Sequence, residues 1–262
     1  MVNCIKAKKY FGQNFLTDST VINKIIQSMP DMQDFGLVEI GPGLGDLTKA
    51  LLEQYAISAY EIDEDLYEHL KKVFEEEIKT GRLELVFGDV MEHWRDKSLK
   101  NSLYWIVANI PYYITTPIIY KVYEDINCLG VVLMVQKEVA LKLTASPSTA
   151  SYSSLSVLTS VLSDARILFD VPKEAFSPPP KVVSSVIKVE KNGISEAVFC
   201  EFKAYLSKAF KSPRKTLKKN LSIYYDQKRL FEIFSKLEID TNLRPHELAA
   251  KSHFRLFNSL TD

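Results

Sequence analysis

Residues 36–54 read GLVEIGPGLGDLTKALLEQ, and this stretch decides the fold. The apolar run Gly36–Ile40 stops in the glycine cluster GPGLG, and the residues after Gly45 place their apolar side chains at helical spacing. That order predicts a strand, a tight loop and a helix. Further apolar runs predict strands at 57–62, 83–87, 103–108 and 131–135, and helices at 63–76 and 138–144. Because strands alternate with helices, we expect an α/β fold with a mostly parallel, doubly wound sheet.

The second half of the chain adds two strands and then changes character. A polar loop at 146–154 precedes a predicted helix at 155–162 and predicted strands at 166–170 and 182–189. From about Glu196 onward, apolar residues recur only at helical spacing. We therefore predict two domains: a seven-stranded sheet domain over residues 1–193 and a small helical domain over residues 194–262.

Composition and cysteine usage limit the classes of protein that remain. Among the 262 residues no apolar run approaches the roughly 18–20 residues needed to cross a bilayer, and the start MVNCIKAKK lacks the apolar core of a signal peptide. Cys4, Cys128 and Cys200 form no CxxC pair, so neither a disulfide framework nor a zinc site is indicated. We expect a cytoplasmic protein without a metal ion. Nothing in the sequence indicates an obligate dimer, so a monomer is expected.

The positive charges are clustered although the net charge is zero. Seven lysines and arginines fall between Lys203 and Asn220 without a single acid, and Lys6, Lys8 and Lys9 lie near the start. Affinity for phosphates depends on such local clustering. The segment indicates a nucleic-acid partner, and a solvated helix face is the alternative.

The glycine cluster and two strand-end acids predict an adenosine cofactor. Gly41 and Gly43 allow a close approach of the backbone to a ligand, and Glu39 precedes them. Glu61 ends the second strand, where a carboxylate can accept the ribose hydroxyls, and Asp89 follows the third, within reach of an adenine amine. A pyrophosphate cofactor favours GxGxxG spacing, whereas this loop is GxGxG. S-adenosylmethionine is therefore favoured over a nicotinamide. A tight packing turn with solvated acids is the alternative.

Asn109, Ile110, Pro111 and Tyr112 follow the fourth predicted strand directly. An adenine amine is a poor nucleophile because its lone pair is delocalised into the ring. The Asn109 side-chain oxygen and the Ile110 carbonyl can accept hydrogen bonds from that amine, and Pro111 fixes the loop that presents them. Tyr112 can stack on a base taken out of its stack. The segment predicts methyl transfer to an adenine amine, and a plain turn after a strand is the alternative.

Seven motifs along most of the chain match one known family. They are FGQNFLTD (11–18), VEIGPGLGDLT (38–48), YEID (60–63), GDV (88–90), NIPYYITTP (109–117), FSPPPKV (176–182) and AFKSPRKTLKKNL (209–221). With these motifs the chain resembles the small-subunit ribosomal RNA adenine dimethyltransferase family. The large-subunit adenine methyltransferases share the N-terminal motifs but typically lack the proline at position 42 and the FSPPPKV string.

The resemblance implies roles for residues that spacing alone does not mark. It implies that Asn14 and Leu16 contact the cofactor, that Gly41, Glu61, Asp89 and Asn109 complete its pocket, and that Phe176 forms the second face of an adenine clamp opposite Tyr112. A core aromatic is the alternative for Phe176. The chain departs from the family pattern at two positions. Tyr113 stands where the family often has a small or polar residue after the first tyrosine, and Val183 replaces the acid that usually follows PPPKV. We expect altered packing or loop contacts at both positions.

The resemblance also implies the substrate: two adjacent adenines of small-subunit ribosomal RNA, dimethylated within an immature small subunit. Lys211, Arg214, Lys215, Lys218 and Lys219 fall three or four residues apart and would give the helical domain a phosphate-facing stripe. Three alternatives stay open: a ribosome-assembly factor that only docks or has a dual role, a large-subunit adenine methyltransferase, and a nicotinamide oxidoreductase.

Overall fold

The chain divides into two compact units. The computed structural model describes residues 7–8, 12–32, 34–95, 98–193 and 195–261. The first compact unit, here called the sheet unit, consists of the described residues up to Ala140 together with Arg166–Glu190. The second, the helical unit, consists of Leu141–Ala165 and the described residues from Lys191 onward.

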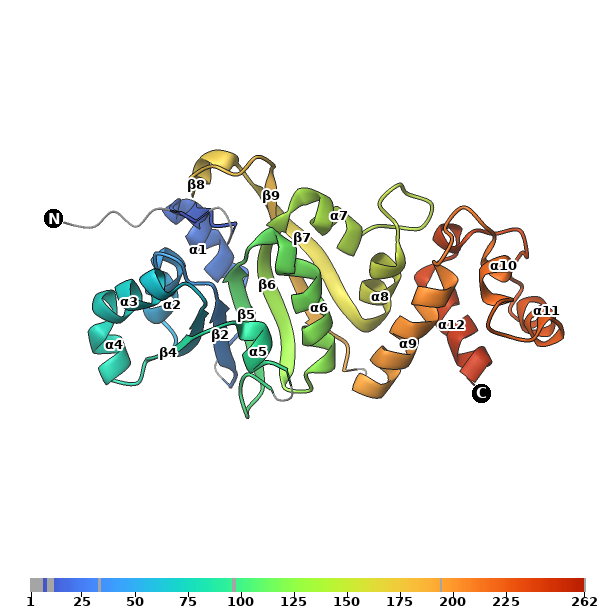
Figure 1. Ribbon diagram of the computed structural model, residues 1–262, viewed down its shortest axis with the longest axis horizontal. Helices are drawn as coiled ribbons and strands as arrows, with labels where there is room; N and C mark the ends of the chain where they lie inside the picture. The colour runs from blue at the N-terminus through green and yellow to red at the C-terminus, as the bar shows by residue number, and fades with distance from the viewer. Residues whose placement is uncertain (1–6, 9–11, 33, 96–97, 194, 262) are drawn as a thin grey trace. The chain divides into compact units, whose positions relative to one another are not determined.

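A seven-stranded sheet organises the sheet unit (Figure 1). β2 pairs in parallel with β3 and β5, β5 pairs in parallel with β6, and β9 runs antiparallel to β6. The predicted α/β fold class with a mostly parallel seven-stranded sheet is confirmed. The strands lie in the order β4 (Leu83–Phe87), β3 (Ile57–Glu61), β2 (Gly36–Ile40), β5 (Tyr104–Asn109), β6 (Cys128–Gln136), β9 (Ser184–Lys191) and β7 (Ser163–Val171).

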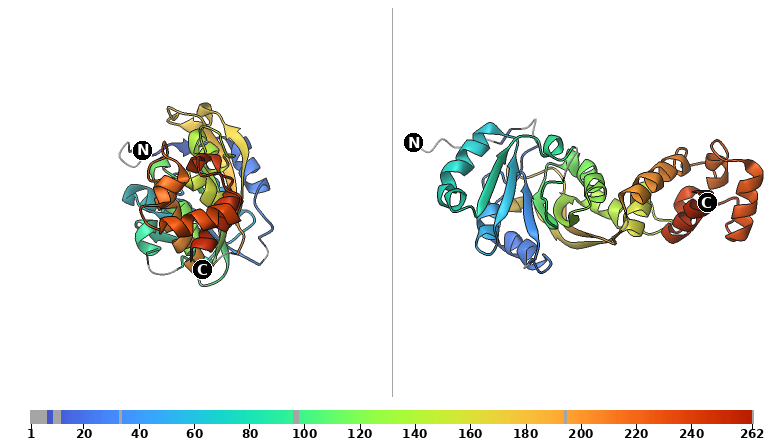
Figure 2. Two further views of the ribbon diagram at one scale, coloured as in Figure 1. Left: turned by 90° about the vertical axis from the view of Figure 1, so that its right-hand side faces the viewer. Right: turned by 90° about the horizontal axis from the view of Figure 1, so that it is seen from below.

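Helices lie on both faces of this sheet (Figure 2). The helix predicted over 63–76 is in fact two helices, because Phe74 leaves helical geometry (φ −112°, ψ 31°) and turns its buried ring toward Gly45. The helices are α1 (Ser19–Gln27), α2 (Asp46–Leu52), α3 (Glu64–Val73), α4 (Glu75–Lys79), α5 (Val90–His93), α6 (Thr115–Glu124) and α7 (Lys137–Leu143).

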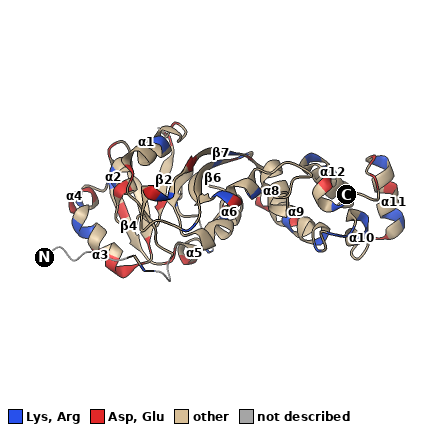
Figure 3. Ribbon diagram, turned by 90° about the horizontal axis from the view of Figure 1, so that it is seen from above, with Lys and Arg blue, Asp and Glu red and all other residues tan. Residues whose placement is uncertain are grey.

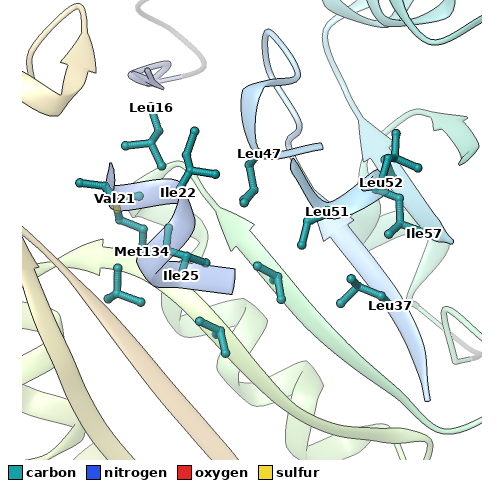
Figure 4. Close-up of a cluster of buried hydrophobic side chains, with 14 of the residues drawn as sticks. Leu16, Val21, Ile22, Ile25, Leu37, Leu47, Leu51, Leu52, Ile57 and Met134 are labelled. Atoms are coloured by element: carbon teal, nitrogen blue, oxygen red, sulfur yellow. The ribbon is translucent and has the colours of Figure 1, made fainter. Parts of the chain in front are cut away.

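The central strands are buried on both faces, and side-chain alternation divides them between two layers. Trp105 and Val107 of β5 point to the same layer as Val132 and Met134 of β6. In that layer they join the apolar side chains of α1 and α2, including Ile22, Ile25, Leu47 and Leu51 (Figure 4). This packing fixes α2, and with it the glycine loop at its N-terminus, against the sheet.

A second, two-stranded sheet was not predicted. β1 (Phe15–Leu16) pairs antiparallel with β8 (Phe176–Ser177), which brings the N-terminal arm beside the proline-rich segment. Strands of two residues carry too little periodicity to be recognised from sequence.

The helical unit contains five α-helices among its described residues, packed through aromatic side chains. Phe202 stacks on Tyr205 at 5.8 Å between ring centroids and meets Phe254 and Phe257 of the last helix. The helices are α8 (Ser154–Leu162), α9 (Glu196–Ala209), α10 (Leu217–Leu221), α11 (Gln227–Lys236) and α12 (Ala250–Thr261).

The limits of the compact units differ from the predicted domain limits of 1–193 and 194–262. Residues 141–165 group with the helical unit because α8 packs on α9 and α12. The predicted boundary residue Ile194 lies outside the described residues. Within the described ranges, no helix has the length and apolarity that a membrane span requires.

Candidate active site

The loops after β2, β3, β4 and β5 surround a cavity in the sheet unit, and the N-terminal arm forms one wall. The carboxyl ends of parallel strands meet at one sheet edge, which is why these loops converge. Every residue predicted for cofactor binding lines the cavity, as does the whole predicted methyl-transfer segment. These residues are Asn14, Leu16, Glu39, Gly41, Gly43, Glu61, Asp89, Asn109, Ile110, Pro111 and Tyr112.

The glycine loop between β2 and α2 lines the cavity. Gly41 has φ +67°, a conformation that side-chain-bearing residues rarely adopt. A Cβ built on Gly41 would meet no described atom within 4 Å, so the space above it is open. Gly43 has φ +61°, and a Cβ there would lie 3.0 Å from the Phe15 ring, so the arm rests directly on the loop.

Two buried carboxyl groups lie beneath the loop. Glu61 accepts hydrogen bonds from the Gly43 N–H at 3.1 Å and from the Asp63 N–H at 2.9 Å, and so ties two loops together. Glu39 accepts a hydrogen bond from the Thr48 hydroxyl at 2.7 Å. Burial raises the pKa of Glu39 to about 8 despite that bond, and the nearby Glu61 adds to the rise. Burial also raises the pKa of Glu61. Such a pair favours a positively charged ligand, which relieves the cost of ionising both groups.

Sequence reasoning did not identify the residues that anchor the N-terminal arm. Lys8 Nζ lies 2.6 Å from an Asp63 oxygen and 2.7 Å from an Asp65 oxygen, and Gln13 Nε2 donates to Asp63 at 2.8 Å. Burial alone would raise the pKa of Asp63, but these bonds outweigh it and hold that pKa below its ordinary value. The YEID motif contains Asp63, yet nothing in its spacing pointed to a partner in the arm.

Asn109 ends β5 and is oriented by the same arm. Its Nδ2 donates a hydrogen bond to the Asn14 carbonyl at 3.0 Å. A carbonyl can only accept, so the amide nitrogen must face Asn14 and Oδ1 remains available as an acceptor. Among the described residues, none donates a hydrogen bond to this oxygen. The amide therefore has the orientation that acceptance from a substrate amine requires.

Tyr112 begins a short 3-10 helix (Tyr112–Ile114), and a residue of β9 holds its side chain. Its hydroxyl lies 2.7 Å from the Ser184 hydroxyl on β9. Burial raises the pKa of Tyr112, so the phenol stays neutral. Ser184 is fully buried and was not predicted, although it follows the FSPPPKV motif by two residues.

Phe176 is not among the described residues that line the cavity. It pairs with Leu16 between β8 and β1, is 4% exposed and belongs to the apolar cluster of the sheet unit. Its proposed role as the second face of an adenine clamp stays a prediction.

The two positions that depart from the family pattern lie in different places. Tyr113 lines the cavity and is 64% exposed. The Val183 carbonyl accepts a hydrogen bond from the Lys137 N–H.

The basic segment of the helical unit does not form one helical stripe. Lys211, Arg214 and Lys215 lie in the connection after α9, and only Lys218 and Lys219 lie on α10. Buried Asn220 shapes this connection by bonding both the N–H and the carbonyl of Ser212 at 3.0 Å. In the arm, Lys8 is already paired with acids, and Lys6, Lys9 and Phe11 lie outside the described residues.

A family model described as ribosomal RNA adenine dimethylase matches residues 4–262. The chain belongs to the ribosomal RNA adenine dimethylase family. This membership confirms the predicted family, and with it the predicted class of enzyme and its cofactor, S-adenosylmethionine.

Curated relatives agree with this assignment over nearly the full chain. The ribosomal RNA small subunit methyltransferase A of Aliarcobacter butzleri is 46% identical over 98% of this chain and 97% of its own length. The protein of the same name from Campylobacter concisus is 47% identical over 97% of this chain and 94% of its own.

Two solved structures share the dimethylase fold. A dimethyladenosine transferase from Plasmodium falciparum superposes with a TM-score of 0.79 at 24% identity, covering 94% of this chain and 98% of that one. The 23S rRNA methyltransferase ErmE gives 0.75 at 23% identity, covering 95% of this chain and 100% of that one. At these identities the likeness concerns the fold alone.

Proposed function

We propose that this chain dimethylates the exocyclic amines of two adjacent adenines in small-subunit ribosomal RNA, and that it acts on an immature small subunit. The observation that carries the proposal is the orientation of Asn109, whose amide oxygen is left as an acceptor beside the cofactor cavity. The names of the curated relatives support the choice of the small subunit.

The residues around the cavity fit S-adenosylmethionine. Open space lies above Gly41, and the buried acids Glu39 and Glu61 favour a positive ligand. Asp89 caps α5 by accepting from the Met91 N–H at 2.8 Å and remains exposed toward the cavity. Bound cofactor would supply an electrophilic methyl group on a positively charged sulfur.

The chain's own residues prepare the nucleophile. Asn109 Oδ1 and the Ile110 carbonyl accept hydrogen bonds from the adenine amine and draw its nitrogen toward tetrahedral geometry. Tyr112 stacks on the extruded base, and its hydrogen bond to Ser184 holds the hydroxyl end of the ring in place. The methylated amine is acidic and loses its proton without a strong base.

The helical unit contributes RNA contacts in this proposal. Lys211, Arg214, Lys215 and Lys219 are exposed, and Lys218 is half-buried. Contacts of this kind position an RNA through its phosphates without reading its sequence. We further propose that the enzyme works as a monomer in the cytoplasm.

The test is methyl transfer from labelled cofactor to undermethylated small subunits. Asn109→Ala is expected to lose at least about 100-fold in kcat, because the acceptor for the amine is removed together with the hydrogen bond to Asn14. It should still bind the subunit, because the proposed RNA contacts of the helical unit are unchanged. Asn101→Ala, an exposed asparagine of the same unit, is the matched control and is expected to match wild type. Methylation of large subunits instead would assign the chain to the other branch of the family. If wild type and Asn109→Ala support ribosome assembly equally well, the chain would instead be an assembly factor that acts by docking.

A further inference from the structure

The helical unit exposes apolar side chains beside its basic segment. Ile223 is 60% exposed and Tyr224 is 41% exposed, and both lie between α10 and α11; Phe231, on α11, is 56% exposed. Other rings of the unit are used differently: Phe199, Phe202 and Phe234 are almost fully buried. Because exposed rings contribute little to stability, their position next to a basic cluster suggests a use in binding.

Each exposed ring has a lysine ammonium over it. Lys218 Nζ lies 5.0 Å from the centroid of Phe231. Lys211 Nζ lies 5.3 Å from the centroid of Tyr224 and donates to its hydroxyl at 2.9 Å. Lys208 Nζ lies 5.5 Å from Tyr224 and 5.3 Å from Tyr225. We call these six residues the aromatic–lysine surface. Figure 3 marks the basic positions around α9 and α10.

The lysines of this surface have no carboxylate partner among the described residues. A lysine–ring pair in the sheet unit is different. Lys71 lies 5.4 Å from the Tyr67 ring, but it also pairs with Glu68 at 3.0 Å, and Tyr67 packs on Phe87. In that pair the lysine has an acidic partner and the ring has an aromatic one, whereas on the aromatic–lysine surface Lys211 is exposed and so are Tyr224 and Phe231.

A ring beside an unpaired ammonium matches the repeating chemistry of an unpaired nucleotide. The base offers a flat face that stacks on the part of the ring left exposed beside the lysine, and the phosphate offers a negative charge that pairs with the ammonium. In a duplex the base faces are hidden, so the rings would contribute nothing. An acidic protein would use the lysines but would gain less from flat aromatic faces.

We infer that the aromatic–lysine surface is a stacking site for unpaired nucleotides, so that the helical unit holds a single-stranded segment of the RNA. The inference rests on the proposed function, since it takes ribosomal RNA as the partner. It adds that this unit distinguishes single strands from duplexes, which phosphate contacts alone do not do.

The test compares binding of two labelled RNAs to the full chain by fluorescence anisotropy: an unstructured strand of roughly 12 nucleotides and a duplex of the same length. Phe231→Leu and Tyr224→Leu remove the ring but keep apolar bulk. Each is expected to weaken single-strand binding about 5- to 10-fold and to leave duplex binding unchanged. Lys219→Gln, which removes a charge without a ring, is expected to weaken both RNAs. Tyr67→Leu is the matched control and is expected to leave both affinities unchanged.

The inference is overturned if the wild-type chain does not prefer the single strand, or if the ring variants bind it as tightly as wild type. It is also overturned if the rings matter only for binding of labelled polyglutamate, because the surface then belongs to an acidic protein. Circular dichroism of each variant establishes that it is folded. Methyl transfer to small subunits is measured in parallel. If the wild-type chain methylates small subunits but the ring variants bind the single strand as tightly as wild type, only the inference about the surface is wrong. If the wild-type chain does not methylate small subunits, the proposed function is wrong.

Discussion

Asn109 and Tyr112 are each fixed by one hydrogen bond from outside their own loop. Asn109 is bonded to Asn14, which is 95 residues away in the chain, and Tyr112 to Ser184, which is 72 residues away. The sequence could predict the loop because the motif directly follows a strand. It could not predict the partners, since no local spacing relates residues so far apart.

Ser184→Ala is expected to lower kcat/KM for small subunits by about 3- to 10-fold, because one hydrogen bond orienting the Tyr112 ring is lost. Ser184→Thr, which keeps a hydroxyl, should recover most of that loss. Ser185→Ala serves as the matched control, because the neighbouring serine is bonded to Asp170 instead. Steady-state kinetics of the three variants check this. An unchanged kcat/KM in Ser184→Ala would show that the ring needs no such support.

At the scale of the element, the link between β2 and α2 does two tasks at once. Packing of α2 on the sheet was predictable from the spacing of Leu47 and Leu51. The loop that α2 holds must also leave room for a ligand, and Gly41 meets that need with a left-handed backbone and nothing above it.

Gly41→Ala is expected to lose cofactor affinity by at least about 10-fold, because its methyl group enters the cavity. Gly81→Ala is the matched control: Gly81 also has positive φ (+73°) and open space, but it lies outside the cavity. Both variants should lose about 1 kcal/mol of unfolding free energy through backbone strain. Calorimetric titration with S-adenosylmethionine and urea unfolding measure the two effects. If both variants bind the cofactor equally well, the open space above Gly41 is not needed for cofactor binding.

Packing of α12 on α9 includes a buried histidine. His253 donates through Nε2 to the Pro245 carbonyl at 2.8 Å, which leaves Nδ1 to accept from the Tyr205 hydroxyl at 3.0 Å. Burial lowers the pKa of His253 to about 4, although the bond to Pro245 opposes the change. The ring is therefore neutral in the folded chain and titrates near its ordinary pKa of about 6.5 in the unfolded chain.

The sign of the resulting pH dependence follows from linkage. The unfolded chain binds the proton more readily, so the contribution of His253 is fully present above about pH 6.5 and falls as pH drops through 4, by up to about 3 kcal/mol. In His253→Gln this loss should be absent, and the stability gap between wild type and variant should narrow on acidification. Urea unfolding at pH 7, 5.5 and 4.5 tests it. A constant gap would mean that the pKa of His253 is the same in the folded and the unfolded chain.

At the scale of the whole molecule, a net charge of zero conceals an uneven distribution of charge. Acids dominate the N-terminal turn of α3 and all of α4, whereas no acid occurs between Lys203 and Asn220. RNA affinity should therefore depend on a few local cations and not on the overall balance.

The double variant Arg214→Gln/Lys215→Gln is expected to weaken RNA binding and to reduce the slope of log affinity against log salt by about 2, roughly 1 for each lost phosphate contact. Lys49→Gln, an exposed lysine on α2, is the matched control and should leave the slope unchanged. Binding titrations between 50 and 200 mM salt measure the slopes. An unchanged slope in the double variant would remove these two residues from the interface.

Prediction from sequence succeeded where a pattern is local and failed where it is not. The strands and the glycine loop follow from short periodicities, and the acids at strand ends follow from the geometry of a parallel sheet. The arm anchored by Lys8 and Gln13, the β1–β8 pair and the assignment of α8 to the helical unit all depend on contacts between distant segments. The basic residues do not follow one helix, because α9 ends at Ala209 and Asn220 bonds both backbone groups of Ser212 in the connection that follows. Their contact with phosphates stays a prediction.

The interleaving of the two units bears on how the chain is made. Residues 141–165 are synthesised before α9 and α12, so α8 emerges from the ribosome before the two helices on which it packs. The sheet unit likewise waits for Arg166–Glu190 to supply its last strands. A chain that ends at residue 190 would therefore contain α8 without α9 and α12. Transferring either complete unit to another protein requires two separate chain segments.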